Sequence, residues 1–160
     1  MSRPLQPVPR WAIYASWILS IIGLGLAAYL TWEHYNAKVF NGCPENSVFN
    51  CQVVTTSAQS TFLGIPVAVL GLANFIVFAI INSPWAWRVR HYWLHVARLV
   101  LVVGGMAFVL WLLYAELMII NKFCLYCTGV HLVTFAMFVV LVSVVPTQLG
   151  WVAPRDSAAQ

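Results

Sequence analysis

The side chains in this sequence that are best suited to chemistry are four cysteines in two close pairs. Cys43 and Cys51 have seven residues between them, and Cys124 and Cys127 form a Cys-x-x-Cys motif. An even number of cysteines at short spacings indicates disulfides, thiol redox chemistry or a metal site. Structural zinc ligands usually come as two pairs on tight turns, which the seven-residue gap fits poorly, so we expect no metal.

The two pairs differ in what they can do. The Cys124–Cys127 pair opens an apolar stretch, and free N–H groups at a helix start stabilise a thiolate, the form of cysteine that attacks disulfides. Cys43 and Cys51 lie in a turn-rich stretch, so a disulfide between them would be mobile and easily reached. A mobile pair and a fixed pair suit a thiol relay, which proceeds through mixed disulfides. A purely stabilising disulfide between Cys43 and Cys51 stays open as an alternative.

The composition indicates that the elements around these cysteines lie in a membrane. The chain is 62% hydrophobic and 8% charged, whereas soluble domains carry about 25% charged residues. Four apolar stretches are long enough to cross a bilayer as helices, at about 11–32, 62–82, 95–118 and 124–145. We therefore predict an all-α fold, an integral membrane four-helix bundle with one domain over residues 1–160. The basic residues are too few and too scattered to bind nucleic acid.

Prolines and charges set the expected helix ends and orientation. Pro66 should lie near the start of the second helix, Ser83-Pro84 should end it, and Pro146 should end the fourth. Basic residues favour the cytoplasmic side, so both termini should be cytoplasmic. The long loop from about 33 to 61 and all four cysteines then face outward. The basic residues on the predicted cytoplasmic side are Arg3, Arg10, Arg88, Arg90, Arg98 and Arg155, against Lys38 and Lys122 outside.

The order of four motifs resembles bacterial homologues of vitamin K epoxide reductase, across roughly residues 11–146. The motifs are the loop cysteine pair, Val-Val-Thr-Thr-Ser at 53–57, Leu-Gly-Ile-Pro-Val-Ala at 63–68 and Cys-Leu-Tyr-Cys at 124–127. The similar DsbB-type oxidases place their Cys-x-x-Cys in the first external loop. Here that motif comes last, which favours the first family.

The resemblance implies a role for each cysteine and for Ser57. Cys43 would exchange with a thioredoxin-like protein, and Cys51 would pass electrons to Cys124. Cys127 would lie next to a quinone of the menaquinone, ubiquinone or phylloquinone type, with Ser57 near the site. Many bacterial members carry a fused thioredoxin-like domain that these 160 residues lack, so a separate DsbA-type partner is expected.

Several other side chains are candidates for the quinone site. His131 lies nearly two helical turns after Cys124, on the same face, where it could bond a quinone oxygen or pass a proton. Animal members of the family have a tyrosine at this place. A packed histidine is the alternative. Phe62, Phe123 and Tyr126 could line the ring pocket, although aromatic residues are common at membrane boundaries.

Other polar groups are weaker candidates. Glu116 could serve a proton path, but a surface carboxylate near Lys122 is the favoured interpretation. Asn74 is expected to make an interhelical hydrogen bond, and Gly104-Gly105 to permit close helix packing. His91 and His95 are interpreted as cytoplasmic loop residues.

These observations predict a membrane thiol:quinone oxidoreductase that re-oxidises a thioredoxin-like protein for extracytoplasmic disulfide formation. Electrons would pass from Cys43 and Cys51 to Cys124 and Cys127, and then to a quinone. One alternative is a reductase whose main product is vitamin K quinol or the de-epoxidised quinone. The other is a non-catalytic membrane protein with structural disulfides.

Overall fold

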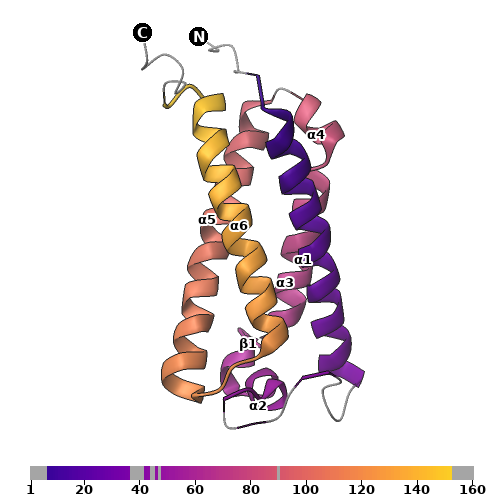
Figure 1. The fold of residues 1–160 in the computed structure, drawn as a ribbon, viewed down its shortest axis with the longest axis vertical. Coiled ribbons are helices and arrows are strands. Elements are labelled where there is room, and N and C mark those ends of the chain that lie inside the picture. Colours follow the sequence, from indigo (N-terminus) through magenta and orange to yellow (C-terminus); the bar gives the residue numbers. More distant parts are fainter. Residues whose placement is uncertain (1–6, 37–41, 44–45, 47, 90, 153–160) are drawn as a thin grey trace.

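The computed structural model describes residues 7–36, 42–43, 46, 48–89 and 91–152. It is an all-α membrane protein whose long helices run side by side (Figure 1). The start of α1 and the end of α6 lie at one end of the molecule, and α2 and β1 lie at the other. The long helices are α1 (Arg10–Asn36), α3 (Val67–Ile81), α5 (Tyr92–Tyr114) and α6 (Leu125–Gln148). The short elements are α2 (Cys51–Thr55), the 3-10 turn η1 (Ala58–Ser60), β1 (Thr61–Phe62), β2 (Ile65–Pro66), α4 (Pro84–Arg88) and the π-helix η2 (Ala115–Ile120).

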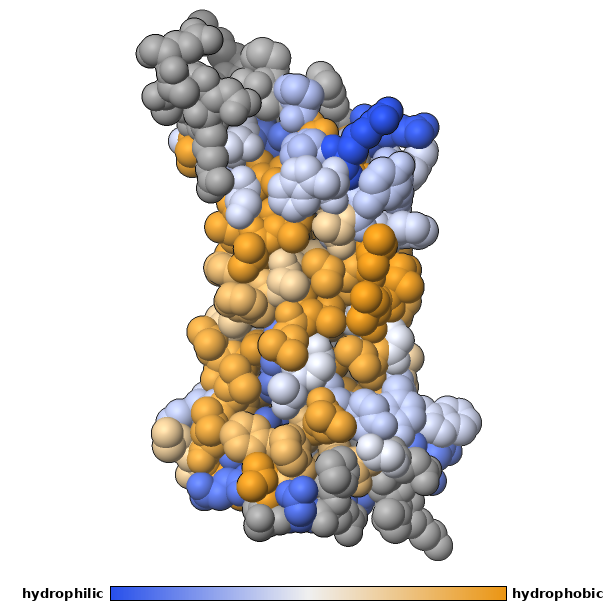
Figure 2. All heavy atoms as spheres, viewed as in Figure 1, coloured by the Kyte–Doolittle hydropathy of each residue, from blue (hydrophilic) through white to orange (hydrophobic). Residues whose placement is uncertain are grey.

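The surface has the pattern expected for a bilayer, with an apolar band between two more polar ends (Figure 2). Three helical stretches of the described chain are long and apolar enough to cross a membrane: α1, α5 together with η2, and α6. The helix α3 is apolar but has 15 residues, about 22 Å at 1.5 Å per residue. The prediction of a membrane protein is confirmed, and α3, which was expected to be one of four spans, is a shorter helix than expected.

A β-hairpin accounts for the short α3, which was expected to begin at Phe62. Thr61–Phe62 pairs antiparallel with Ile65–Pro66. Leu63 and Gly64 form the turn with φ angles of 52° and 80°, a left-handed conformation that glycine accepts easily and leucine rarely adopts. Pro66 therefore caps the helix from outside, and α3 begins at Val67.

Two other predicted helix ends were wrong. The fourth helix runs through Pro146 to Gln148. Pro146 has no N–H, so the helix loses one i→i−4 hydrogen bond at this point without ending there. Ser83-Pro84 was expected to end the second helix, and α3 does end just before it, at Ile81. A short helix, α4, then begins at Pro84, because the Ser83 hydroxyl accepts the Ala86 N–H at 3.2 Å and caps it. The third predicted helix was expected to end at about 118. Instead, α5 passes into the π-helix η2, which ends at Ile120.

The core lies where α1 packs against α3 and α6, and where α5 packs against α6. Phe75, Phe78, Met137 and Leu141 are fully enclosed there. Gly23 on α1 faces the Phe75 ring so closely that a Cβ atom at this position would collide with it. The absence of a side chain at Gly23 therefore sets the distance between α1 and α3.

At the end of the molecule that carries α4, a buried arginine joins three elements. Arg98 donates from Nε and Nη2 to the Ile81 carbonyl at 3.0 and 2.6 Å, and from Nη1 to His95 at 3.0 Å. Its guanidinium lies 3.8 Å from the centre of the Trp87 ring. His95 was expected in a loop, but it is a buried residue of α5. Four residues used to predict orientation, Arg3, Lys38, Arg90 and Arg155, lie outside the described residues.

Candidate active site

The first loop is fastened to the start of α6 by backbone pairing. The Asn50 N–H donates to the Phe123 carbonyl at 3.0 Å, and the Phe123 N–H donates to the Val48 carbonyl at 3.0 Å. The Phe49 and Phe123 rings lie 6.2 Å apart across this bridge. These bonds place the residues just after Phe49 beside those just after Phe123, and each segment carries a cysteine.

Cys43 and Cys51 form a disulfide, with their Cα atoms 6.1 Å apart. The Asn50 side chain accepts the Val53 N–H at 3.0 Å and starts α2 at Cys51. Cys51 is consequently buried, with none of its surface exposed, whereas Cys43 is partly exposed. The disulfide was expected to be easily reached, but only its Cys43 side is accessible.

Cys124 and Cys127 are free thiols at the start of α6. Cys124 is the N-cap residue, and its sulfur accepts the Cys127 N–H at 3.2 Å. The Cys127 thiol is also hydrogen-bonded to the Cys124 side chain, so the two sulfurs are neighbours. The expected stabilisation by the helix start therefore acts on the Cys124 sulfur, and not on that of Cys127.

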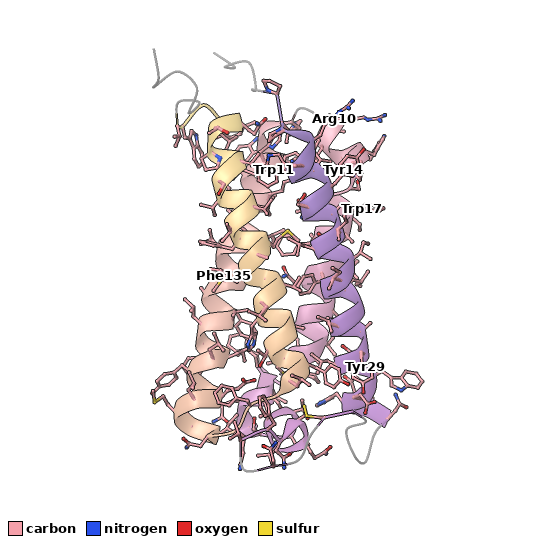
Figure 3. The ribbon with its side chains drawn as sticks, viewed as in Figure 1. Arg10, Trp11, Tyr14, Trp17, Tyr29 and Phe135 are labelled. Atoms are coloured by element: carbon pink, nitrogen blue, oxygen red, sulfur yellow. A yellow bond between two sulfur atoms is a disulfide. The ribbon has the colours of Figure 1, made fainter. Side chains whose placement is uncertain are left out.

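The two cysteine pairs share one apolar cluster. Cys51 and Cys124 are both fully buried members of it, together with Leu30 and Val54, and Cys43 and Cys127 pack against its edge. Water therefore has no access to Cys51 or Cys124 in this cluster. Figure 3 shows Tyr29 on α1 at this end, far from Trp11, Tyr14 and Trp17 at the opposite end of the same helix.

A cavity of about 430 Å³ adjoins Cys127. The largest shares of its walls come from α5 and α3, with further residues from α1, η2, α6 and the segment from α2 to β1. Cys127, His131, Ser57 and Phe62 line it as the sequence suggested, and Cys124 is not among its lining residues. Of the Cys124–Cys127 pair, Cys127 therefore faces the cavity, while Cys124 is buried in the cluster that also contains Cys51.

Buried polar groups point into this largely apolar space. His131 and Glu116 are 6% and 3% exposed, and both line the cavity. Among the described residues, His131 Nδ1 and Glu116 Oε2 find no hydrogen-bond partner. Glu116 was interpreted as a surface carboxylate, and this was wrong because η2 turns its side chain inward.

The remaining predicted site residues lie around the cavity in different ways. Phe62 meets Phe108 edge to face at 5.6 Å, and the Ser57 hydroxyl donates to the Val54 carbonyl at 2.7 Å. Phe123 and Tyr126 do not line the cavity in the described part of the chain. Phe123 belongs to the loop bridge, and the Tyr126 ring packs 4.7 Å from that of Tyr29.

Sequence reasoning missed some residues of the cavity wall. Gly104 was expected to allow close helix packing, yet a Cβ atom there would meet nothing within 4 Å, and both Gly104 and Gly105 line the cavity. A Cβ atom at Gly105 would lie 3.7 Å from Asn74 Nδ2, so α3 and α5 do approach each other at this residue. His34, Phe108 and Thr134 also contribute to the wall. Their helical spacing is that of any packed helix, so no sequence signal distinguishes them.

The cavity suits the ring of a quinone. Small-molecule sites typically have volumes of about 300–1,000 Å³, with apolar walls and a few polar groups that fix orientation. Unpaired polar atoms on His131 and Glu116 could meet the oxygens of such a ring, and Phe62 and Phe108 could face its plane. In the described part of the chain, no group of three or more His, Cys, Asp or Glu side chains could hold a metal ion.

A disulfide, a neighbouring dithiol and an apolar membrane fold fit the class of membrane thiol oxidoreductases. The model of the vitamin K epoxide reductase family matches residues 14–142, which is most of the chain. The protein belongs to this family, whose members are oxidoreductases that act with quinones.

Proposed function

We propose that the protein is a thiol:quinone oxidoreductase that re-oxidises a thioredoxin-like protein of the DsbA type, and so supports extracytoplasmic disulfide formation. The observation that carries the proposal is the different exposure of the four sulfurs. Cys43 is accessible, Cys51 and Cys124 are buried in one cluster, and Cys127 lines the cavity. This order is the order of a relay from an external thiol to a membrane-soluble acceptor.

Each exchange in the relay conserves two electrons. A partner thiolate attacks Cys43 and releases Cys51, and the second partner thiol then frees Cys43 and leaves the partner as a disulfide. Cys51 next attacks Cys124 in its disulfide with Cys127. Cys43 resolves that mixed disulfide, which re-forms the outer pair, Cys43–Cys51, as a disulfide and leaves the inner pair, Cys124 and Cys127, reduced. The oxidised outer pair and reduced inner pair in the structure correspond to this stage.

The inner thiols then deliver their electrons to a quinone of the menaquinone, ubiquinone or phylloquinone type. His131 would hydrogen-bond one quinone oxygen, and Phe62 and Ser57 would form part of the wall. We assign Phe123 and Tyr126 a supporting role, because they hold the loop and Tyr29 against the start of α6. Chemistry at Cys127 is kept away from water because the cavity is largely apolar.

The proposed topology has four spans, cytoplasmic termini and all cysteines outside. Arg10 and Arg88 lie at the same end as α4, and Lys122 follows η2 at the other end, which agrees with the bias of basic residues towards the cytoplasm. In intact cells, a membrane-impermeant thiol reagent should label Cys43 after reduction. Labelling only after the cells are opened would contradict this orientation.

Trapping of the partner tests the proposed function. In a Cys51→Ala variant, the free Cys43 thiol can attack the disulfide of the oxidised thioredoxin-like protein, and no Cys51 thiol is present to break the resulting mixed disulfide, so a covalent complex should accumulate. Mass spectrometry of the complex should show the bond at Cys43. Cys43→Ala is the matched control and should trap nothing through the outer pair. If Cys51→Ala captures no thioredoxin-like protein, the outer disulfide is structural.

A further inference from the structure

We propose that Glu116 is the group that accepts the proton of the Cys127 thiol and passes it on to the reduced quinone. The inference rests on the proposed function and adds a residue to it. The inference is based on the position of Glu116, whose buried carboxylate lies in the cavity wall near the Cys127 thiol.

The two oxygens of Glu116 have different surroundings. One carboxylate oxygen accepts a hydrogen bond from the Cys124 backbone N–H, and in the described structure Oε2 has no partner. The carboxylate also interacts electrostatically with the Cys127 thiol. The hydrogen bond to the Cys124 N–H holds the carboxylate against the start of α6. The second oxygen, Oε2, is then available for a proton.

The local backbone explains why this side chain points inward. Residues Ala115–Ile120 form a π-helix, and Asn121 ends it with a left-handed φ of 53°. Widened turns of this kind are rare and occur frequently at functional sites. Glu116 is 3% exposed, although its neighbours Leu117 and Met118 are 46% and 67% exposed. The π-helix therefore turns the Glu116 carboxylate inward while its neighbours face outward.

Few other groups near the cavity can carry a proton. The other titratable side chains that line it are His34 from α1, and Cys127 and His131 from α6. The lining residues from α3, α5 and the segment between α2 and β1 are not titratable. Neither Cys124 nor Lys122 lines the cavity in the described structure.

The proposed step balances protons and electrons. Glu116 takes the proton from Cys127, whose sulfur gives an electron pair to the quinone. The Cys124 sulfur then bonds to the Cys127 sulfur and loses its own proton. Two thiol protons and two electrons reach the quinone oxygens, a disulfide forms, and Glu116 returns to the carboxylate. A fixed carboxylate suits this task because proton transfer by a positioned group accelerates reactions about 10²–10⁴-fold.

The decisive variant is Glu116→Gln, which can keep the bond to the Cys124 N–H but cannot accept a proton. With dithiothreitol as donor and ubiquinone-1 or menaquinone-1 as acceptor, its turnover at neutral pH should fall by about 10²-fold or more. The loss should shrink as pH rises, because a larger fraction of the Cys127 thiol is then ionised without the help of a base. Glu33→Gln is the matched control: Glu33 is also buried and has an unpaired Oε2, but it does not line the cavity. It should stay within about twofold of the unmodified protein, far from the loss expected for a missing general base.

A measurement without quinone separates a proton role from a structural one. Alkylation of Cys127 by iodoacetamide, followed by mass spectrometry across pH, should show a titration step from Glu116 in addition to thiol ionisation, because Glu116 and Cys127 share a proton. Glu116→Gln should lack that step. An unchanged alkylation profile, or a turnover loss that is constant at every pH, overturns the role of Glu116. If the unmodified protein reduces neither quinone, the proposed function itself fails.

Discussion

At the scale of residues, the two sulfurs within each pair have different surroundings. Cys51 and Cys124 are fully buried, whereas Cys43 is partly exposed and Cys127 lines the cavity. Sequence spacing could separate the two pairs, because Cys-x-x-Cys differs visibly from a seven-residue gap. It could not show which sulfur of each pair faces which neighbour, since that depends on the bridge between Phe49 and Phe123, residues far apart in the chain.

His131 gives a prediction at this scale. Replacement by Leu removes the proposed hydrogen bond to the quinone, a loss of about 1.4 kcal/mol, so kcat/KM for ubiquinone-1 should fall about tenfold. His91→Leu is the control, because His91 is an exposed residue at the opposite end of the molecule. Equal kcat/KM values for His131→Leu and the unmodified protein would show that His131 is only a packed histidine.

At the scale of elements, hydrophobic stretches located the long helices but not their ends. The hairpin at 61–66 was missed because Phe62, Leu63 and Ile65 are as apolar as the helix that follows. Glu116 was misinterpreted for a related reason. No sequence pattern predicts the π-helix, and a regular α-helix would direct the carboxylate differently. In both places local backbone geometry, and not hydrophobicity, decides what a residue faces.

The contact between α1 and α3 depends on Gly23. Gly23→Val should lower the free energy of unfolding by about 1–3 kcal/mol, because the new side chain must displace the Phe75 ring. Gly25→Val on the same helix is the control, since a Cβ at Gly25 would meet nothing within 4 Å. Denaturation in detergent would measure both variants. Equal stability of the two would contradict the packing of α1 on α3.

The contact between α3 and α5 depends on Arg98. Arg98→Lys keeps the charge but loses the forked donors that hold the Ile81 carbonyl. The free energy of unfolding should fall by about 1–3 kcal/mol, because a buried acceptor loses its partner. Arg88→Lys, on the exposed surface of α4, should leave stability unchanged. A similar effect of both substitutions would mean that Arg98 does not fasten these helices.

At the scale of the whole molecule, composition alone predicted a membrane protein, because soluble domains are much less hydrophobic and carry more charged residues. The apolar band and the polar ends agree with that prediction. The position of the cavity could not be predicted in the same way. It arises because α3 is short and the facing walls of α3 and α5 carry Gly71 and Gly104, where a Cβ would meet nothing.

The central claim is that electrons leave the protein from Cys127 to a quinone in this cavity. The most direct measurement is reduction of ubiquinone-1 or menaquinone-1 by purified protein with dithiothreitol, followed by absorbance. The unmodified protein should turn over and Cys127→Ala should not, although its outer disulfide should still form. Turnover by Cys127→Ala at the rate of the unmodified protein would contradict the account.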